Sequence, residues 1–201
     1  MKVKTLISGI ALLSIGAVTM TLGSCNKQAD LSTEEIADLE YLREEEKLAR
    51  DVYLYAFDLY GDAVFQSISA SEQKHMDKIL VLLNDYDIED PASTERGVFN
   101  NVELQHLYNS LIAKTDSSLL DAFIVGATIE DVDIFDIDEF IMRTDQEDIL
   151  DAYEKLECGS NNHMRKFIEK LIELDYDYIP QFISVEQFNT ILAEESGGCG
   201  G

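Results

Sequence analysis

The feature that most constrains this chain is a set of four long segments with apolar residues at helical spacing, each interrupted near its middle by polar groups. In the second segment the inward positions are Phe65, Ile68, Glu72, His75, Ile79, Leu82 and Tyr86. A buried carboxylate costs free energy unless it is neutral or has a partner. A Glu-x-x-His pair that faces inward from a helix is an arrangement with which bundle cores hold metal ions.

The other three segments show the same interruption. Glu130 and Asp133 break the apolar seam of the third segment, Ser160 and His163 break that of the fourth, and Glu45 and Glu46 flank or enter that of the first. A polar group buried without a partner costs on the order of 1–3 kcal/mol, so four such seams predict a shared partner. A metal ion would be that partner, and oxygen and imidazole ligands without thiolate suit iron or manganese.

The spacing of apolar residues predicts an all-α fold. Helices are expected at residues 33–60, 63–86, 102–113, 118–142, 144–174 and 184–193. The short turn at Gly61-Asp62 makes the first two helices antiparallel neighbours. Residues 87–97 are rich in helix breakers, so a long connection is expected to cross the bundle before the third long helix. The prediction is an antiparallel four-helix bundle over residues 33–195, with a short C-terminal helix.

Local signals refine the first and last long helices. Ser32 or Thr33 is expected to cap the first helix, and Thr144 the last one, with Glu147 completing a capping box. The charged residues of the first helix are expected to face away from the core: Arg43, Lys47, Arg50 and Asp51.

The N-terminus reads as a targeting segment. Lys2 and Lys4 precede an apolar run over residues 6–22, and Leu22-Gly23-Ser24-Cys25 resembles the lipobox of bacterial lipoproteins. That resemblance implies that residues 1–24 are removed and Cys25 is lipidated. Residues 25–32 then form a tether, and the protein is anchored in the bacterial cell envelope, facing outside the cytoplasm. An ordinary signal peptide or a short membrane anchor are the alternatives.

Composition excludes some partners. The 201-residue chain has 40 acidic against 15 basic residues and a net charge of −25. Such a surface repels nucleic acids and anionic lipid, and it attracts cations. Contact with the membrane is therefore expected only through the lipid anchor. Residues 196–201 form a glycine-rich tail, whose flexibility disfavours a disulfide between Cys158 and Cys199, although such a bridge would be allowed outside the cytoplasm.

Several stretches carry a family resemblance. A Glu followed by Ala-Arg and then Tyr, in Glu46 to Tyr53, resembles the first-helix motif of rubrerythrin-type ferritin-like proteins, and Glu72-x-x-His75 resembles their second-helix motif. A closer resemblance is to the ferritin-like family DUF2202, carried by Glu44-Glu45-Glu46-Lys47-Leu48-Ala49-Arg50-Asp51-Val52-Tyr53, Ser71-Glu72-Gln73-Lys74-His75-Met76, Asp90-Pro91, Gly97-Val98-Phe99 and Ser160-Asn161-Asn162-His163. The resemblance implies a ferritin-like bundle with a dinuclear iron or manganese site.

The matched metal ligands are five: Glu46, Glu72, His75, Glu130 and His163. The usual di-iron pattern has a second Glu-x-x-His on the last helix, where this chain has Ser160. Manganese catalases also use five ligands with a lone His on that helix, so the departure is compatible with two metal ions. Asp133 is a candidate substitute for the missing carboxylate, Glu45 is a rival to Glu46, and a single-metal site is an alternative.

These features lead to three hypotheses of function. The first is an oxidoreductase whose two Fe or Mn ions react with O2 or peroxide. The second is a lipoprotein that binds or sequesters metal without turnover. The third is a metal-free helical interaction domain. Tyr53 and Tyr153 are expected to pack in the core, with hydrogen bonding near the metal as a further role, and His106 is expected on the surface.

Overall fold

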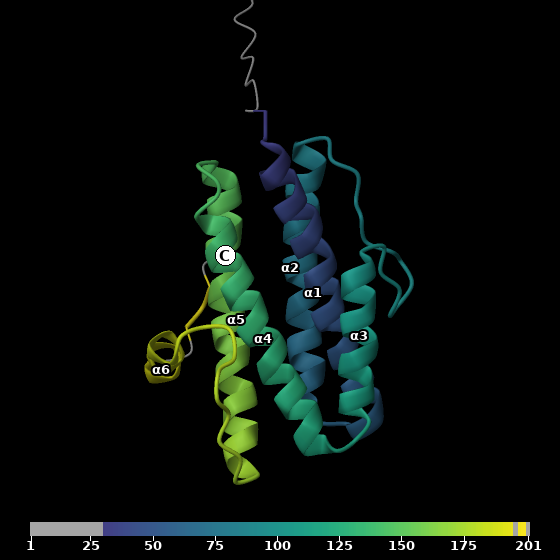
Figure 1. Ribbon diagram of the computed structural model, residues 1–201, viewed down its shortest axis with the longest axis vertical. Coiled ribbons are helices and arrows are strands. Elements are labelled where there is room, and N and C mark those ends of the chain that lie inside the picture. Colours follow the sequence, from purple (N-terminus) through teal and green to yellow (C-terminus); the bar gives the residue numbers. More distant parts are fainter. Residues whose placement is uncertain (1–29, 195–196, 200–201) are drawn as a thin grey trace, which may run out of the picture.

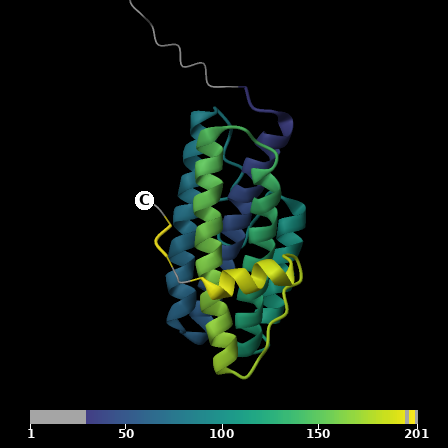
Figure 2. The same cartoon turned by 90° about the vertical axis from the view of Figure 1, so that its left-hand side faces the viewer.

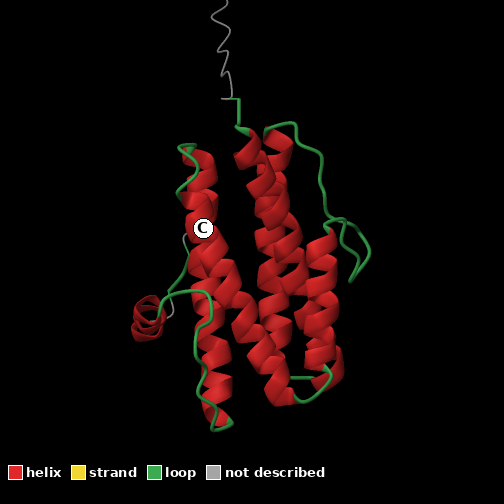
Figure 3. Ribbon diagram, viewed as in Figure 1, coloured by secondary structure: helices red, strands yellow, loops and turns green. Residues whose placement is uncertain are grey.

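The computed structural model describes residues 30–194 and 197–199, and within these ranges it is all-α with no strand (Figures 1 and 3). The six helices are α1 (Thr33–Tyr60), α2 (Ala63–Asp85), α3 (Val102–Thr115), α4 (Leu119–Ile141), α5 (Glu147–Glu173) and α6 (Val185–Ala193). The predicted signal peptide, residues 1–24, and the predicted lipidation site Cys25 lie outside the described residues. The order and type of the predicted helices are confirmed.

The ends of α1 follow from local chemistry. The hydroxyl of Ser32 accepts a hydrogen bond from the Glu35 backbone N–H, and the Glu35 carboxylate accepts one from the Ser32 N–H, which completes a capping box. At the other end Gly61 has a φ of 69°, a left-handed conformation that glycine adopts without steric cost. The short turn that follows makes α1 and α2 antiparallel neighbours, as predicted.

The predicted capping box at Thr144 is wrong. Helix α5 begins at Glu147, and its N-cap residue Gln146 makes no side-chain cap. The Thr144 hydroxyl instead donates to Glu35 Oε1 at 2.6 Å and accepts from the Gln146 backbone N–H at 3.1 Å. The hydroxyl is used to hold the α4–α5 turn against the start of α1.

The four long helices lie side by side (Figures 1 and 2). Helix α1 packs along α2 and α4 along α5, and contacts of α2 with α5 and of α1 with α4 close the bundle. The core consists of two apolar clusters. One contains Phe65, Phe123 and Phe167, and the other contains Leu39, Ile79 and Leu156. Polar side chains occupy the region between them, as the interrupted seams predict.

The charged residues of α1 do not face solvent as predicted. Lys47 and Asp51 are fully buried, and Arg43 is 6% exposed. The Lys47 ammonium contacts Asp51 Oδ2 at 2.6 Å and donates to the carbonyl oxygens of Glu95 and Val98 at 2.9 and 3.1 Å. The connection between α2 and α3 runs along this side of α1 and covers it (Figure 1).

Two further charged residues of α1, Glu44 and Arg43, also bind the connection between α2 and α3. Glu44 accepts backbone hydrogen bonds from Asn100 at 2.7 Å and Asn101 at 2.9 Å, at the start of α3. Arg43 makes two hydrogen bonds to the carboxylate of Asp90, at 2.8 and 3.0 Å. The acidic and basic residues of α1 therefore tie the long connection to the bundle.

The C-terminal segment is also tied down. The buried carboxylate of Asp131 on α4 accepts hydrogen bonds from the Tyr178 hydroxyl at 2.9 Å and from the backbone of Gln181 at 2.6 Å. This places α6 across the long helices (Figure 2). Contrary to the expectation from the flexible tail, Cys158 and Cys199 form a disulfide. None of the described helices is long and apolar enough to span a membrane.

Candidate metal centre

Five polar side chains from the four long helices meet between the two apolar clusters. Glu46 lies on α1, Glu72 and His75 on α2, Glu130 on α4 and His163 on α5. Four of them are at most 2% exposed, and His75 is 8% exposed. The structure thus places all five predicted ligands together in the core.

Glu72 stands at the centre of this group. Its Oε2 lies 2.8 Å from His75 Nδ1, and its Oε1 lies 2.8 Å from His163 Nδ1. His75 Nδ1 is also 3.1 Å from Glu46 Oε2, and His163 Nδ1 is 3.5 Å from Glu130 Oε2. The five residues therefore form two groups that could each hold a metal ion, Glu46-Glu72-His75 and Glu72-Glu130-His163, which share Glu72.

Several of these atoms lack a hydrogen-bond partner. Glu72 Oε1 and His163 Nδ1 are close together, but their orientation satisfies neither of them, and Glu46 Oε1 also has no partner among the described residues. Ligand atoms at right angles around an ion with bonds of about 2.1 Å lie about 3.0 Å apart. Close, unsatisfied oxygen and nitrogen atoms are what a site built for a cation presents in its absence, so these residues fit a metal ion.

The charges at the site are strongly coupled. Burial raises the pKa of Glu46 to about 7, against the lowering effect of His75. Burial would also raise the pKa of Glu72, but the two imidazolium groups of His163 and His75 lower it below its ordinary value. For His163 burial alone would lower the pKa, but Glu72 and Glu130 raise it to about 10. Burial would likewise lower the pKa of His75, but Glu46 and Glu72 raise it well above its ordinary value. Without metal, both imidazoles are therefore the protonated countercharges of the carboxylates at neutral pH.

Glu45 and Asp133, the two alternative ligands, belong to neither of the two candidate metal-binding groups. Burial and the nearby Asp133 and Asp136 raise the pKa of Glu45 well above its ordinary value. Burial and Glu46 do the same for Asp133. Ser160 hydrogen-bonds to Asp133 Oδ2 and to the Leu156 carbonyl, while Asp133 Oδ1 and Glu45 Oε2 have no partner among the described residues. Asp133 thus lies against Ser160, the residue that stands where the usual di-iron pattern has a glutamate.

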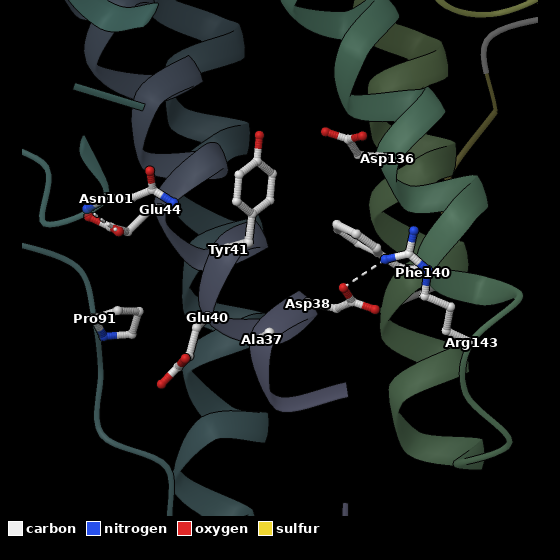
Figure 4. Close-up of a pocket in the computed structure, with 10 residues that line it drawn as sticks. All are labelled: Ala37, Asp38, Glu40, Tyr41, Glu44, Pro91, Asn101, Asp136, Phe140 and Arg143. Atoms are coloured by element: carbon white, nitrogen blue, oxygen red, sulfur yellow. Dashed lines mark hydrogen bonds and ion pairs between the residues drawn. The ribbon is translucent and has the colours of Figure 1, made fainter. Parts of the chain in front are cut away.

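A hollow of about 570 Å³ is lined by residues of α1, of α4 and of the long connection (Figure 4). Tyr41 of α1 and Asp136 of α4 lie on opposite sides of it, and Arg143 pairs with Asp38 at 3.0 Å across its far end. Asp136, on its wall, interacts with the buried Glu45.

Two supporting residues complete the site. The Tyr53 hydroxyl donates to Glu130 Oε1 at 2.6 Å, which gives this residue the hydrogen-bonding role considered for it. Gly159 was not predicted. A Cβ atom at this position would lie 2.4 Å from His75 Nε2, so α5 can pass the imidazole only because residue 159 has no side chain. The signal for Gly159 was a glycine inside a helix, one turn before a candidate ligand.

Two predicted side-chain positions away from the centre are confirmed. Tyr153 is buried in the core, 1% exposed, and His106 is exposed on α3. His106 is therefore remote from the carboxylate and imidazole group and is suited to serve as a control position.

Fold and site together define a class: an all-α helical bundle whose core carries carboxylate and imidazole groups that could bind a metal ion. Residues 35–195 match the family described as "Uncharacterized protein domain (DUF2202)", and the chain belongs to this family. The resemblance to DUF2202 that the sequence motifs showed is thereby confirmed.

One relative is similar over most of its length. The chain is 46% identical over 167 residues to "Uncharacterized protein MJ0754" of Methanocaldococcus jannaschii, a match that covers 83% of this chain and 90% of the relative. It also resembles the crystal structure of hypothetical protein MJ0754 from Methanococcus jannaschii, with a TM-score of 0.83, 44% identity and coverage of 85% of this chain and 98% of that one. The fold described above is therefore shared with an experimentally determined structure.

Proposed function

We propose that this chain is a ferritin-like metalloprotein with a dinuclear Fe or Mn centre, and that it acts as an oxidoreductase on O2 or peroxide. The observation that carries the proposal is the position of Glu72. Its two carboxylate oxygens lie at the same distance, 2.8 Å, from the Nδ1 atoms of two different histidines. A carboxylate with an imidazole at each oxygen could serve as a ligand shared by two metal ions.

The residues divide naturally between two ions. Glu46 and His75 would hold one ion, Glu130 and His163 the other, and Glu72 would lie between them. Three carboxylates and two neutral imidazoles would offset most of the charge of two divalent cations. Tyr53 would hold the Glu130 carboxylate in position through its hydroxyl. Such hydrogen bonds to ligands commonly change metal affinity or activity by about 10–100-fold.

The donor set favours a redox metal. All candidate ligand atoms are carboxylate oxygen or imidazole nitrogen, which suits iron or manganese better than structural zinc. Bound Fe or Mn would supply the electron-transfer chemistry that none of these side chains can supply. The chain's own contribution would be a buried site, in which Glu72 could be a ligand of both ions and apolar clusters pack on the surrounding helices.

Metal content tests the centre. We expect protein purified from metal-replete cells to contain about two Fe or Mn ions per chain by elemental analysis. Glu72→Gln should lose both ions, and His75→Ala should lose at least one. The matched control is His106→Ala, which replaces an exposed histidine of α3 and should retain both. Circular dichroism establishes that each variant is folded. Folded wild-type protein without metal would refute the proposal and favour a metal-free interaction domain.

Turnover tests the reaction. The loaded protein is expected to consume hydrogen peroxide, or to take up O2 while it oxidises added Fe(II), and Glu72→Gln is expected to do neither. Two bound ions without either reaction would favour the alternative of a protein that only sequesters metal.

We further propose that Cys25 carries lipid and anchors the protein outside the cytoplasm. The support is Leu22-Gly23-Ser24-Cys25 in the sequence, together with the Cys158–Cys199 disulfide, a bond typical of oxidising compartments. Cells labelled with radioactive palmitate should incorporate label into the wild-type protein and not into Cys25→Ser. Equal labelling of both would contradict the proposal.

A further inference from the structure

A second cavity lies on the other side of the two histidines. It has a volume of about 490 Å³, and its lining comes from α2, from α5 and from residues 197–199. His75 and His163 reach it from the core, and Lys74, Lys78, Lys155 and Lys166 line its mouth. We call it the lysine cavity.

The charge of this cavity is opposite to that of the molecule. The chain has a net charge of −25, but four of the seven lysines in the described part of the chain gather here. Lys155 pairs with Asp151 at 2.8 Å. Lys74, Lys78 and Lys166 form no ion pair with any described carboxylate. Lys78 acts on the charge of Asp151 from beyond ion-pair distance, whereas Lys74 and Lys166 have no such described partner, and together these ammonium groups provide a local positive field.

The histidines turn their outer edges toward this field. Their Nδ1 atoms face the carboxylates of the proposed metal centre. Their Nε2 atoms make no hydrogen bond to a described residue, and His75 Nε2 lies against the bare backbone of Gly159. An imidazole that binds metal through one nitrogen carries its proton on the other, and that N–H normally donates to a carboxylate, carbonyl or water. None of the described residues provides such an acceptor here.

The wall of the cavity is fixed by covalent and hydrogen bonds. The Cys158–Cys199 disulfide joins the C-terminal segment to α5 one residue before Gly159. The Asn162 side chain donates to the Gly197 carbonyl at 3.1 Å. Residues 197–199 are thereby held beside the lysines.

We propose that the lysine cavity binds a small oxyanion, of the phosphate or carboxylate class, which is held by Lys74, Lys78 and Lys166 and accepts hydrogen bonds from the histidine Nε2–H groups. The bound anion then takes the place of the acceptor that metal-ligating histidines otherwise find within the protein. The second part rests on the proposed function, because metal at Nδ1 is what places the proton on Nε2. The lysine part stands on the cavity itself.

Calorimetric titration with inorganic phosphate and with acetate tests this inference. Both anions are titrated into the mature chain, once loaded with manganese and once metal-free, and the tighter anion identifies the class. The double variant Lys74→Gln/Lys166→Gln should bind the anion about tenfold more weakly, because two charge contacts with the anion are lost. The control is Lys114→Gln/Lys170→Gln, which removes the same charge from lysines paired with Asp121 and Asp62 elsewhere. It should bind within about twofold of wild type.

The outcomes separate the two proposals. If neither anion binds to wild type, or if the control loses as much affinity as the cavity variant, the inference is refuted, whatever the metal content. If the anion binds through the lysines of a chain that holds no metal, the anion site is confirmed while the proposed metal centre fails. Metal loading should also strengthen anion binding less in His75→Gln than in wild type, and equal strengthening would exclude the hydrogen bond from His75.

Discussion

Gly159 is the residue at which the helix and the site constrain each other most directly. It lies inside α5, where alanine would be favoured by up to about 1 kcal/mol on helix propensity alone. The absence of a Cβ atom there gives space to the His75 imidazole. Glycine at residue 159 therefore lowers the stability of α5, and it leaves the space that the His75 imidazole needs.

Gly159→Ala should separate these two effects. The added methyl group displaces the imidazole, which is the movable end of a side chain, so the melting temperature should stay the same or rise. Metal affinity should fall about 10–100-fold, as for other changes that misplace a ligand. Competition with a chelator measures the affinity. Gly198→Ala, at a position with open space around it, is the control and should bind metal normally. Unchanged affinity in Gly159→Ala would show that the ring position is not critical.

Tyr53 is the second residue with a role that exceeds packing. Burial and the charge of Glu130 raise the pKa of its hydroxyl, so the hydroxyl remains a donor to Glu130 Oε1. Tyr53→Phe leaves that buried oxygen without its donor and should destabilise the metal-free protein by about 1–3 kcal/mol in urea unfolding. Tyr153→Phe is the control, because the equally buried Tyr153 hydroxyl makes no hydrogen bond to a described residue. Equal losses in both variants would contradict this role.

At the scale of elements, the long connection between α2 and α3 depends on α1. Lys47 donates to the Glu95 carbonyl oxygen of the connection, and Asp51 beside it accepts from the Gly97 backbone N–H. The two side chains thus make hydrogen bonds that water would otherwise make. The charged side of α1 looked solvent-exposed in the sequence because charged residues at helical spacing usually are. Its partners, Asp90 and the residues near Gly97, lie about forty or more positions away, where no local pattern can reveal them.

Asp51→Asn tests this contact. The substitution leaves the Lys47 ammonium buried without its countercharge, and loss of one partner of a buried pair typically costs about 3–5 kcal/mol. Asp58→Asn is the matched control on the same helix. It breaks an exposed pair with Arg96 of the same connection and should cost no more than about 1 kcal/mol. Urea unfolding of both variants gives the comparison, and a loss below that of the control would show that the buried pair does not hold the connection.

At the scale of the whole molecule, the core contains more negative groups than positive ones. Glu45, Glu46, Glu72, Glu130 and Asp133 are all buried, and His75 and His163 are the cationic groups among them. Two apolar clusters enclose this region, so the fold must keep several groups protonated or bind cations. The stability of the metal-free protein should therefore depend on pH in a specific direction.

The sign follows from His163. Burial would lower its pKa, but Glu72 and Glu130 raise it from 6.5 to about 10 in the folded chain. A group with a raised pKa stabilises the fold fully below its unfolded value, and this contribution is lost as pH rises through the folded value. Asp133, whose pKa burial and Glu46 raise, acts in the same direction. The melting temperature of the metal-free protein should thus fall between about pH 6.5 and about pH 10.

The metal-loaded protein is the control for this prediction. Metal ions replace the protons as countercharges, so its melting temperature should fall less over the same range. The comparison uses chelator-treated and manganese-loaded samples of the same preparation. A metal-free protein whose stability stays constant or rises with pH would show that protons do not balance the buried carboxylates.

The sequence by itself determined the helices, their order and the polar positions within their apolar seams. These depend on the spacing of residues along one helix, and Ser32, Gly61 and the Glu72-x-x-His75 pair are examples of signals complete within a few residues. The long connection was also predictable from its helix breakers. The predicted role of Thr144 was wrong because its hydroxyl is used by Glu35, more than a hundred positions away.

Only the tertiary structure decided how these parts meet. It grouped Glu46 rather than Glu45 with His75, placed Ser160 against Asp133, and brought Cys199 close enough to α5 for the Cys158–Cys199 bond. It also gathered the lysines of α2 and α5 around one cavity. Neighbouring residues of one helix differ by a rotation of about 100°, and only the packing of the helices against one another decides which of them faces the shared centre.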